Sequence, residues 1–272
     1  MSETSKTVSN ALSVLGCFSR SEPVFTASEL TRRLKVTRTS VIRLLATLER
    51  FGYIERCPDA PGYRIGLRAF EVGTLFLAAN PLSSVLARAL DELVEKTQCT
   101  AYLAVLDKDD VVMLNHREGT LPIRFVWQVG DRLPLNTTAM GKAMLARMSS
   151  EQIDRHLGRG KTLRGLTEKS IRTRSQFDVE IAKTRERGWG FAREESHAGL
   201  TAVGSAILDK ANHPIAAISV SFLDHPPNPK RVKQLATVVM AVADGVSKKI
   251  AEYGNFGASL TRQPQEAAAR RA

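Results

Sequence analysis

The sequence has few cysteines and lacks the long apolar runs of a membrane protein. Its three cysteines, Cys17, Cys57 and Cys99, lie far apart among 272 residues. No Cys-x-x-Cys pair occurs, so neither a zinc finger nor a redox dithiol is indicated. No run of 18 apolar residues occurs, and the first ten residues lack the apolar core of a signal peptide. We therefore expect a cytoplasmic protein with reduced thiols, no metal, no cofactor and no membrane partner.

Signatures of catalysis are also missing. The stretch around Gly141 is similar to a phosphate-binding loop, but that motif needs a glycine at Asn136 and a hydroxyl at Ala143. His197 follows two glutamates, yet no G-x-S-x-G elbow and no second histidine at metal-ligand spacing accompany it. The remaining acidic pair, Asp109 and Asp110, fits a turn better than paired catalytic acids. The sequence thus predicts a protein that is not an enzyme and has no catalytic residues.

Positive charge is abundant instead. The net charge is +11 at pH 7, and the isoelectric point is about 9.9. Such an excess suits an anionic partner, either nucleic acid or an anionic membrane. Residues 30–50 hold six basic residues against Glu49 alone, and the segment 155–174 is basic as well. The charge is therefore not confined to one region and does not by itself choose the partner.

Residues 36–56 combine an apolar helical face with an unusual polar one. Apolar residues recur at i, i+3, i+4 and i+7, which predicts a helix over 38–50 that packs on a core: Val41, Leu44, Leu45 and Leu48. Thr37 is the expected N-cap, and Gly52 the expected C-terminal stop. The opposite face carries hydroxyls and an arginine rather than a Glu/Lys mixture: Thr39, Ser40, Arg43 and Thr47. A solvated surface is the alternative interpretation of this face.

The flanking segments favour DNA binding. A first helix is expected to bury Val8, Leu12, Leu15 and Phe18. Thr26 and Glu29 have the spacing of a capping box for a second helix, which would bury Leu30 and Leu34. Two short strands, "YIER" and "YRIG", follow the third helix.

Helix, helix, tight turn, helix and hairpin together predict a winged helix-turn-helix over residues 4–67. Its third helix would enter the major groove of double-stranded DNA. A helical hairpin for protein contacts is the alternative. The predicted DNA-contacting residues are Thr26, Lys35, Thr37, Arg38, Thr39, Ser40, Arg43, Thr47 and Arg64.

A helix is expected over 68–81, with Phe70, Thr74 and Leu77 along one side and part of it buried against another subunit. Residues 82–254 predict an α+β domain, and 255–272 a disordered tail. Within that domain we expect strands over 100–117, 121–130 and 190–222. The expected helices span 82–97, 138–148, 175–189 and 229–253, the last with Leu235, Val238, Val239, Val242 and Val246 as its core face.

Three stretches carry a family resemblance. "FTASELTRRLKVTRTSVIRLLATLERFGYIER", "VGDRLPLNTTAMGKAMLA" and "RERGWGFAREESHAGLTAVGSAILD" resemble the isocitrate lyase regulator (IclR) family of bacterial transcription factors. The resemblance implies a winged helix-turn-helix, a linker helix and a GAF- or profilin-like effector domain. It also implies a repressor of a catabolic operon that forms dimers or pairs of dimers. Lys35 departs from the family, which usually carries glycine in the turn.

The resemblance also implies an effector pocket, mapped onto Ala139, Met140, Ala192, Ala202, Ser219 and Ser221. Members that bind small organic acids often have glycine at 139, an acid at 192 and cysteine at 202. Three alanines here predict an apolar or aromatic effector. Alternation along the strand places Ser219 and Ser221 on the opposite face from Ile218 and Val220. Two alternatives stay open: the alanines are simple core residues, or the second domain only oligomerises and binds no ligand.

Overall fold

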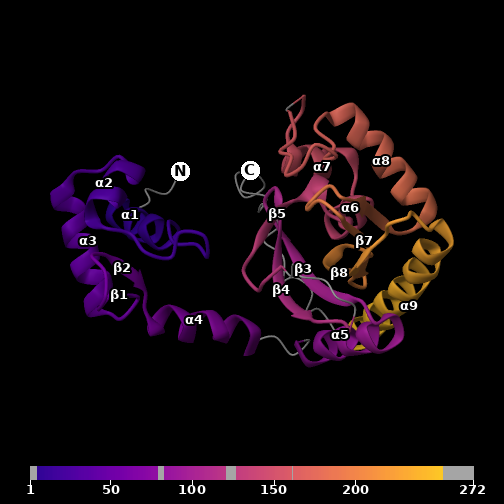
Figure 1. Cartoon of the computed structure of the whole chain (residues 1–272), viewed down its shortest axis with the longest axis horizontal. Helices are drawn as coiled ribbons and strands as arrows, with labels where there is room; N and C mark the ends of the chain where they lie inside the picture. Colours follow the sequence, from indigo (N-terminus) through magenta and orange to yellow (C-terminus); the bar gives the residue numbers. More distant parts are fainter. Residues whose placement is uncertain (1–4, 79–82, 121–126, 161, 254–272) are drawn as a thin grey trace, which may run out of the picture. The chain divides into compact units, whose positions relative to one another are not determined.

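The computed structural model describes residues 5–78, 83–120, 127–160 and 162–253 (Figure 1). The chain divides into two units, Met1–Asn80 and Pro81–Ala272. Each unit has its own apolar core, so each is described separately.

The first unit is a winged helix-turn-helix, as predicted. Three helices pack around a small core of Val14, Leu30, Val41, Leu45 and Ile54. An antiparallel hairpin follows them and forms the wing. The elements are α1 (Lys6–Leu15), α2 (Ala27–Leu34), α3 (Arg38–Arg50), β1 (Ile54–Arg56), β2 (Tyr63–Ile65) and α4 (Leu67–Ala78).

Local side-chain chemistry sets the helix ends of this unit. Thr26 and Glu29 form the predicted capping box, with the Thr26 amide 2.8 Å from the Glu29 Oε2 atom. Thr37 caps α3, because its Oγ1 accepts a hydrogen bond from the Ser40 amide at 3.3 Å. Lys35 adopts the left-handed conformation, with φ 54° and ψ 38°, which strains a residue other than glycine. The turn predicted between α2 and α3 is thus confirmed, including its strained position.

The predicted buried face of α1 is wrong in part. Val8 and Leu12 are 56% and 62% exposed, whereas Val14 is fully buried. Two apolar stripes overlap on this helix, and the one through Ala11 and Val14 has the complete i, i+3, i+4, i+7 spacing. That stripe faces the core, so Val8 and Leu12 point outward.

The second unit is built on one antiparallel sheet in the order β5-β4-β3-β8-β7-β6. Helices α5 and α9 cover one face of the sheet, and α6, α7 and α8 lie on the other (Figure 1). The strands are β3 (Thr100–Asp107), β4 (Asp110–Arg117), β5 (Arg132–Pro134), β6 (Gly190–Arg193), β7 (Leu200–Leu208) and β8 (Pro214–Leu223). The helices are α5 (Ser83–Thr97), α6 (Ala139–Leu145), α7 (Ser150–Leu157), α8 (Arg174–Arg187) and α9 (Pro229–Tyr253), with a 3-10 turn at Leu135–Thr137.

Most expected elements of this unit are confirmed, but the strand predicted over 121–130 is not. Residues 127 and 128 are irregular and 129 and 130 form a turn, while 121–126 lie outside the described residues, as does the predicted tail 255–272. Helix α7 was missed, although Ser149 and Gln152 form a capping box that marks its start. Strand β5 was missed as well, because three residues are too few for a periodic signal.

Candidate functional site

The outward face of α3 carries the predicted polar residues. Arg38, Thr39, Arg43 and Thr47 are exposed, and Ser40 is half-buried against the Thr37 cap. The opposite face is buried through the apolar residues that the sequence identified. The helix therefore rests firmly on its core while it presents two guanidinium groups and several hydroxyls outward.

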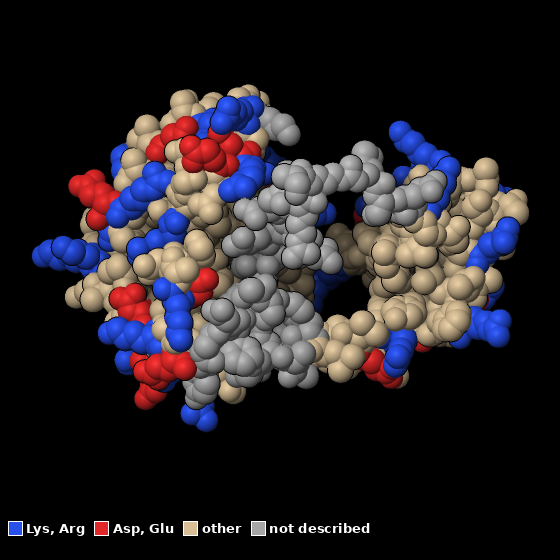
Figure 2. Space-filling model, turned by 180° about the vertical axis from the view of Figure 1, so that it is seen from behind, with Lys and Arg blue, Asp and Glu red and all other residues tan. Residues whose placement is uncertain are grey.

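Charge pairing separates the arginines of this unit into two groups. Those outside α3 include four in ion pairs with glutamates: Arg33 with Glu22, Arg56 with Glu49, Arg64 with Glu55, and Arg68 with Glu71. Among the described residues, neither Arg38 nor Arg43 makes such a pair. Figure 2 shows this unit on the right, with basic side chains on its surface. Two exposed guanidinium groups on one helix, without carboxylate partners among the described residues, are suited to an external anion.

The wing residue Arg64 differs from the α3 arginines. Its Nε lies 2.6 Å from the Glu55 Oε1 atom across the hairpin, and both side chains are about half exposed. An exposed pair of this kind is weak, about 0–1 kcal/mol, so an anion can replace the glutamate. Arg64 is thus available only after it leaves Glu55.

In the second unit, the sheet register brings the six predicted effector residues to one place. One cross-strand row runs through Ser221, Ala202 and Ala192 on β8, β7 and β6. The neighbouring row on the same face runs through Ser219 and Gly204. Helix α6 begins with Ala139 and Met140 against this second row.

Two glycines let the start of α6 lie directly on the sheet. A Cβ atom at Gly190 would meet the Ala139 carbonyl oxygen at 1.9 Å. A Cβ atom at Gly204 would meet the Ala139 carbonyl carbon and the Met140 amide at 3.1 Å. The glycines are therefore required by the close approach of backbone to backbone. The sequence did not predict either glycine as part of the site, because their role depends on the pairing of β6 with β7, which a sequence pattern does not show.

Both cross-strand rows carry polar side chains where they cross β8 and β3. Ser219 and Ser221 are 2% and 3% exposed, and their hydroxyls make no side-chain hydrogen bond to any described residue. Thr100 extends the first row on β3, and Tyr102 extends the second. Ala202 is only half-buried although its strand neighbours are buried. Thr100 and Tyr102 were absent from the predicted site, since only the pairing of β3 with β8 reveals them.

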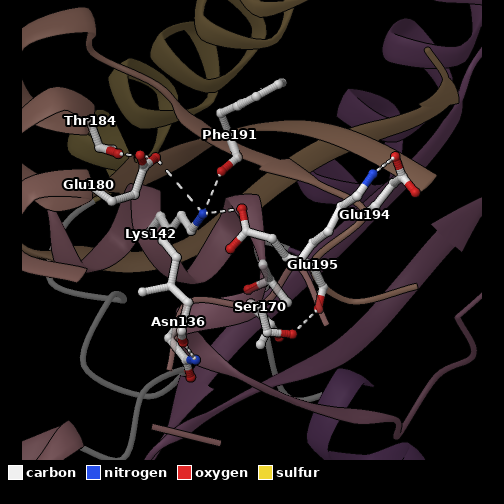
Figure 3. A network of polar contacts seen from close by, with 12 residues as sticks. Asn136, Lys142, Ser170, Glu180, Thr184, Phe191, Glu194 and Glu195 are labelled. Atoms are coloured by element: carbon white, nitrogen blue, oxygen red, sulfur yellow. Dashed lines mark hydrogen bonds and ion pairs between the residues drawn. The ribbon is translucent and has the colours of Figure 1, made fainter. Parts of the chain in front are cut away.

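A buried ion pair at Lys142 also holds α6 close to β6 (Figure 3). The Lys142 ammonium lies 2.6 Å from the Glu195 Oε1 atom and 2.8 Å from the Phe191 carbonyl oxygen. Glu180 on α8 is 3.9 Å away. Burial lowers the pKa of Lys142 and raises the pKa of Glu195, since both charged forms lose their water, and each partner's charge opposes the shift.

The network continues into the loop that precedes α8. The Ser170 hydroxyl donates a hydrogen bond to the Glu195 carbonyl oxygen at 2.6 Å, and the Thr167 hydroxyl donates to the Glu194 carbonyl oxygen at the same distance. Lys169 adds an exposed pair with Glu194 at 2.5 Å. The loop after β6 is therefore held from both sides. This arrangement is structural: it fixes the end of β6 and the start of α6.

Neither a metal centre nor a membrane span is found in the described part of the chain. No group of three histidine, cysteine or acidic residues there is placed to hold a metal ion. None of the helices in those ranges combines the length and apolarity needed to cross a bilayer.

Comparison with known proteins agrees with this geometry. The family description "Bacterial transcriptional regulator IclR C-terminal" matches residues 75–248, and "IclR helix-turn-helix domain" matches residues 7–58. The chain is similar to the transcriptional repressor IclR of Escherichia coli, with 28% identity over 244 residues that cover 89% of each chain.

Two solved structures share the fold. An IclR transcriptional regulator from a Silicibacter species has a TM-score of 0.79 at 24% identity, covering 90% of this chain and 96% of that chain. An IclR homologue from Microbacterium hydrocarbonoxydans, complexed with 4-hydroxybenzoate, has a TM-score of 0.76 at 20% identity, covering 91% and 100%. The family matches together span both units, so the chain belongs to the IclR family of bacterial transcriptional regulators and is not an enzyme.

Proposed function

We propose that α3 reads operator DNA in the cytoplasm and that the protein represses a catabolic operon until an effector binds. Unpaired Arg38 and Arg43 on the exposed face of α3 are the observation that supports this most. Arg43 lies one turn into the helix and is assigned to a base or a deep phosphate. Arg38 is assigned to a phosphate at the helix start. The remaining proposed contacts are Thr26, Lys35, Thr37, Thr39, Ser40, Thr47 and, after release from Glu55, Arg64.

Two substitutions test this assignment. Arg43→Ala should cost about 1–3 kcal/mol of operator affinity and relax the base preference at one position. Arg38→Ala should weaken binding to all sequences and flatten the salt dependence. Lys210→Ala removes one charge from an exposed turn of the second unit and serves as the control. Binding is measured with a library of operator variants at several salt concentrations. Equal, sequence-independent losses for both arginines would show that Arg43 is only a phosphate contact.

We also propose that the effector binds on the face of the sheet next to the start of α6. Met140, Ala192 and Ala202 would form an apolar wall, Ala139 would close the helix side, and the Ser219 and Ser221 hydroxyls would bind polar atoms. The two buried serines, whose hydroxyls make no side-chain hydrogen bond to another described residue, support this site most. Small side chains leave room for an apolar or aromatic molecule.

A test of this site enlarges Ala202, one of the residues of the proposed apolar wall. Ala202→Leu should abolish effector-induced operator release yet leave operator binding intact, because the leucine occupies the ligand's space. Ala211→Leu, in the exposed turn between β7 and β8, is the control. The first probe is 4-hydroxybenzoate, the ligand of the Microbacterium homologue, followed by a metabolite panel. An unaltered response in Ala202→Leu would place the ligand elsewhere. No response to any metabolite would favour the alternative, a ligand-independent protein whose second unit only oligomerises.

We further propose that the protein binds a palindromic operator as a homodimer, or as a tetramer built from two dimers. Apolar side chains stand exposed on both outer helices of the first unit, and a second copy would cover them. They are Val8 and Leu12 on α1, and Leu67, Phe70 and Leu75 on α4.

A further inference from the structure

On the face of the sheet proposed for the effector, two adjacent side chains hold buried polar atoms that make no well-formed hydrogen bond within the described part of the chain. They are the Tyr102 hydroxyl and the His116 Nδ1 atom. Tyr102 is 1% exposed, and it lies directly opposite His116 in the β3–β4 register. Their rings are nearly parallel, 29° apart, with centroids 6.3 Å from one another. A buried polar group without a partner costs about 1–3 kcal/mol, so a pair of them calls for an explanation.

Tyr102 belongs to the proposed effector site by its position in the sheet. It pairs with Ser219 on β8 in the row that continues to Gly204, where α6 begins. The same side of β3 contributes Ala104 and Leu106 to the core beneath α6. His116 extends the row to β4. A ligand that contacts Ser219 is therefore next to Tyr102, and His116 is the next residue along the same row.

The Tyr102 hydroxyl and the His116 Nδ1 atom have different hydrogen-bonding roles. Burial raises the pKa of Tyr102 to about 12, although the nearby backbone amide of Trp127 opposes the shift. The phenol is therefore protonated at neutral pH and can donate a hydrogen bond. We assign the His116 proton to Nε2, which lies 4.0 Å from the Glu118 Oε1 atom, because no described group accepts a proton from Nδ1. The Nδ1 atom is then an acceptor.

The Tyr102 donor beside the His116 acceptor is suited to bind a hydroxyl group. A hydroxyl accepts one hydrogen bond and donates another, so it can satisfy both atoms at once. An ether or a carboxylate only accepts, and it would leave the Nδ1 lone pair unpaired. We propose that Tyr102 and His116 form the polar end of the effector site and bind a hydroxyl group, so that the effector is an alcohol or a phenol. This assignment rests on the effector site proposed above.

The experiment compares matched ligands on the full-length protein by calorimetry. One set is 4-hydroxybenzoate, benzoate and 4-methoxybenzoate, and the second is benzyl alcohol, toluene and benzyl methyl ether. Each hydroxyl compound should bind at least tenfold more tightly than its two counterparts, because a site built around a hydroxyl rejects analogues that lack it. Tyr102→Phe should reduce that ratio to less than threefold while it leaves binding of the counterparts unchanged.

Two further variants keep the result interpretable. His116→Leu removes the acceptor without touching Tyr102 and should cause the same loss of preference. Tyr63→Phe, in the wing of the first unit, should change nothing. Equal binding within each set, retention of the ratio in both variants, or failure of both hydroxyl compounds to bind overturns the proposal. If Ala202→Leu still abolishes an effector response in those cases, the effector site stands and only the hydroxyl assignment fails. If Ala202→Leu has no effect, the site itself is wrong.

Discussion

Removal of Lys142 gives a sharp test of how α6 is held. The Lys142 side chain is 1% exposed, and its ammonium contacts a carboxylate at 2.6 Å and a carbonyl oxygen at 2.8 Å. Lys142→Met keeps most of the apolar side chain but leaves Glu195 as a buried carboxylate without its cation. The second carboxylate oxygen of Glu195 already lacks a partner among the described residues. We therefore expect a cost of about 3–5 kcal/mol at pH 8, the range for breaking a buried ion pair.

The cost should shrink as the pH falls. Burial already raises the pKa of Glu195 in the folded state, and Lys142 is the charge that opposes this rise. Without Lys142 the folded-state pKa is higher still, while the unfolded-state pKa is unchanged. Stability from a raised pKa is fully present below the unfolded value and is lost as the pH rises through the folded value. Each pH unit between the two values is worth about 1.4 kcal/mol, so the variant should recover stability between pH 8 and pH 5.

Tryptophan fluorescence is a specific assay for this unit. Both tryptophans, Trp127 and Trp189, lie in the second unit, so urea unfolding followed by their emission reports on it alone. Lys142→Met combined with Glu195→Gln should recover much of the loss at pH 8, because no buried charge remains. Lys169→Met, which breaks the exposed pair with Glu194, should cost about 0–1 kcal/mol. A Lys142→Met penalty that is equal at pH 5 and pH 8, without recovery in the double variant, would refute this account.

Two other substitutions probe the fold around the sites. Gly190→Ala should destabilise the second unit by more than about 1 kcal/mol in the same urea assay, because its Cβ would meet the Ala139 carbonyl oxygen at 1.9 Å. Gly245→Ala in α9 has open space and should be neutral or stabilising by up to about 1 kcal/mol; an equal loss for both glycines would rule out the backbone contact. Phe70→Glu on α4 should shift the protein toward monomer in analytical ultracentrifugation and weaken palindromic operator binding, whereas an unchanged assembly would exclude the exposed α4 face from the interface.

The first unit was largely predictable because short-range chemistry determines it. The capping box at Thr26, the N-cap at Thr37 and the apolar spacing of α3 all act within a few residues. The error on α1 has the same origin. Two stripes were locally possible, and only the packing of α1 against α3 selects the one through Val14. Local pattern thus predicts that a helix forms more reliably than which face it buries.

The second unit could be predicted only in part, because its site depends on strand pairing. Alternation correctly put Ser219 and Ser221 on one face of β8, opposite Ile218 and Val220 in the other core. It could not show that Tyr102 lies beside Ser219, since β3 and β8 are more than a hundred residues apart in the chain. Lys142 was read only as part of a failed phosphate-loop motif. Its actual contacts, with Glu195 and the Phe191 carbonyl, come from the close approach of α6 to β6.

The strand register also shows that the small residues of the proposed site are small for different reasons. Gly190 and Gly204 must be small because the α6 backbone occupies the space above them. Ala192 is 2% exposed, so ordinary core packing is enough to account for it. Ala202 is different: it is half-buried, although Thr201 and Val203 beside it on β7 are buried. A small residue that stays accessible within a buried strand favours open space over that point of the row. Ala202 is therefore the position where core packing and the proposed ligand site predict opposite results for a leucine substitution.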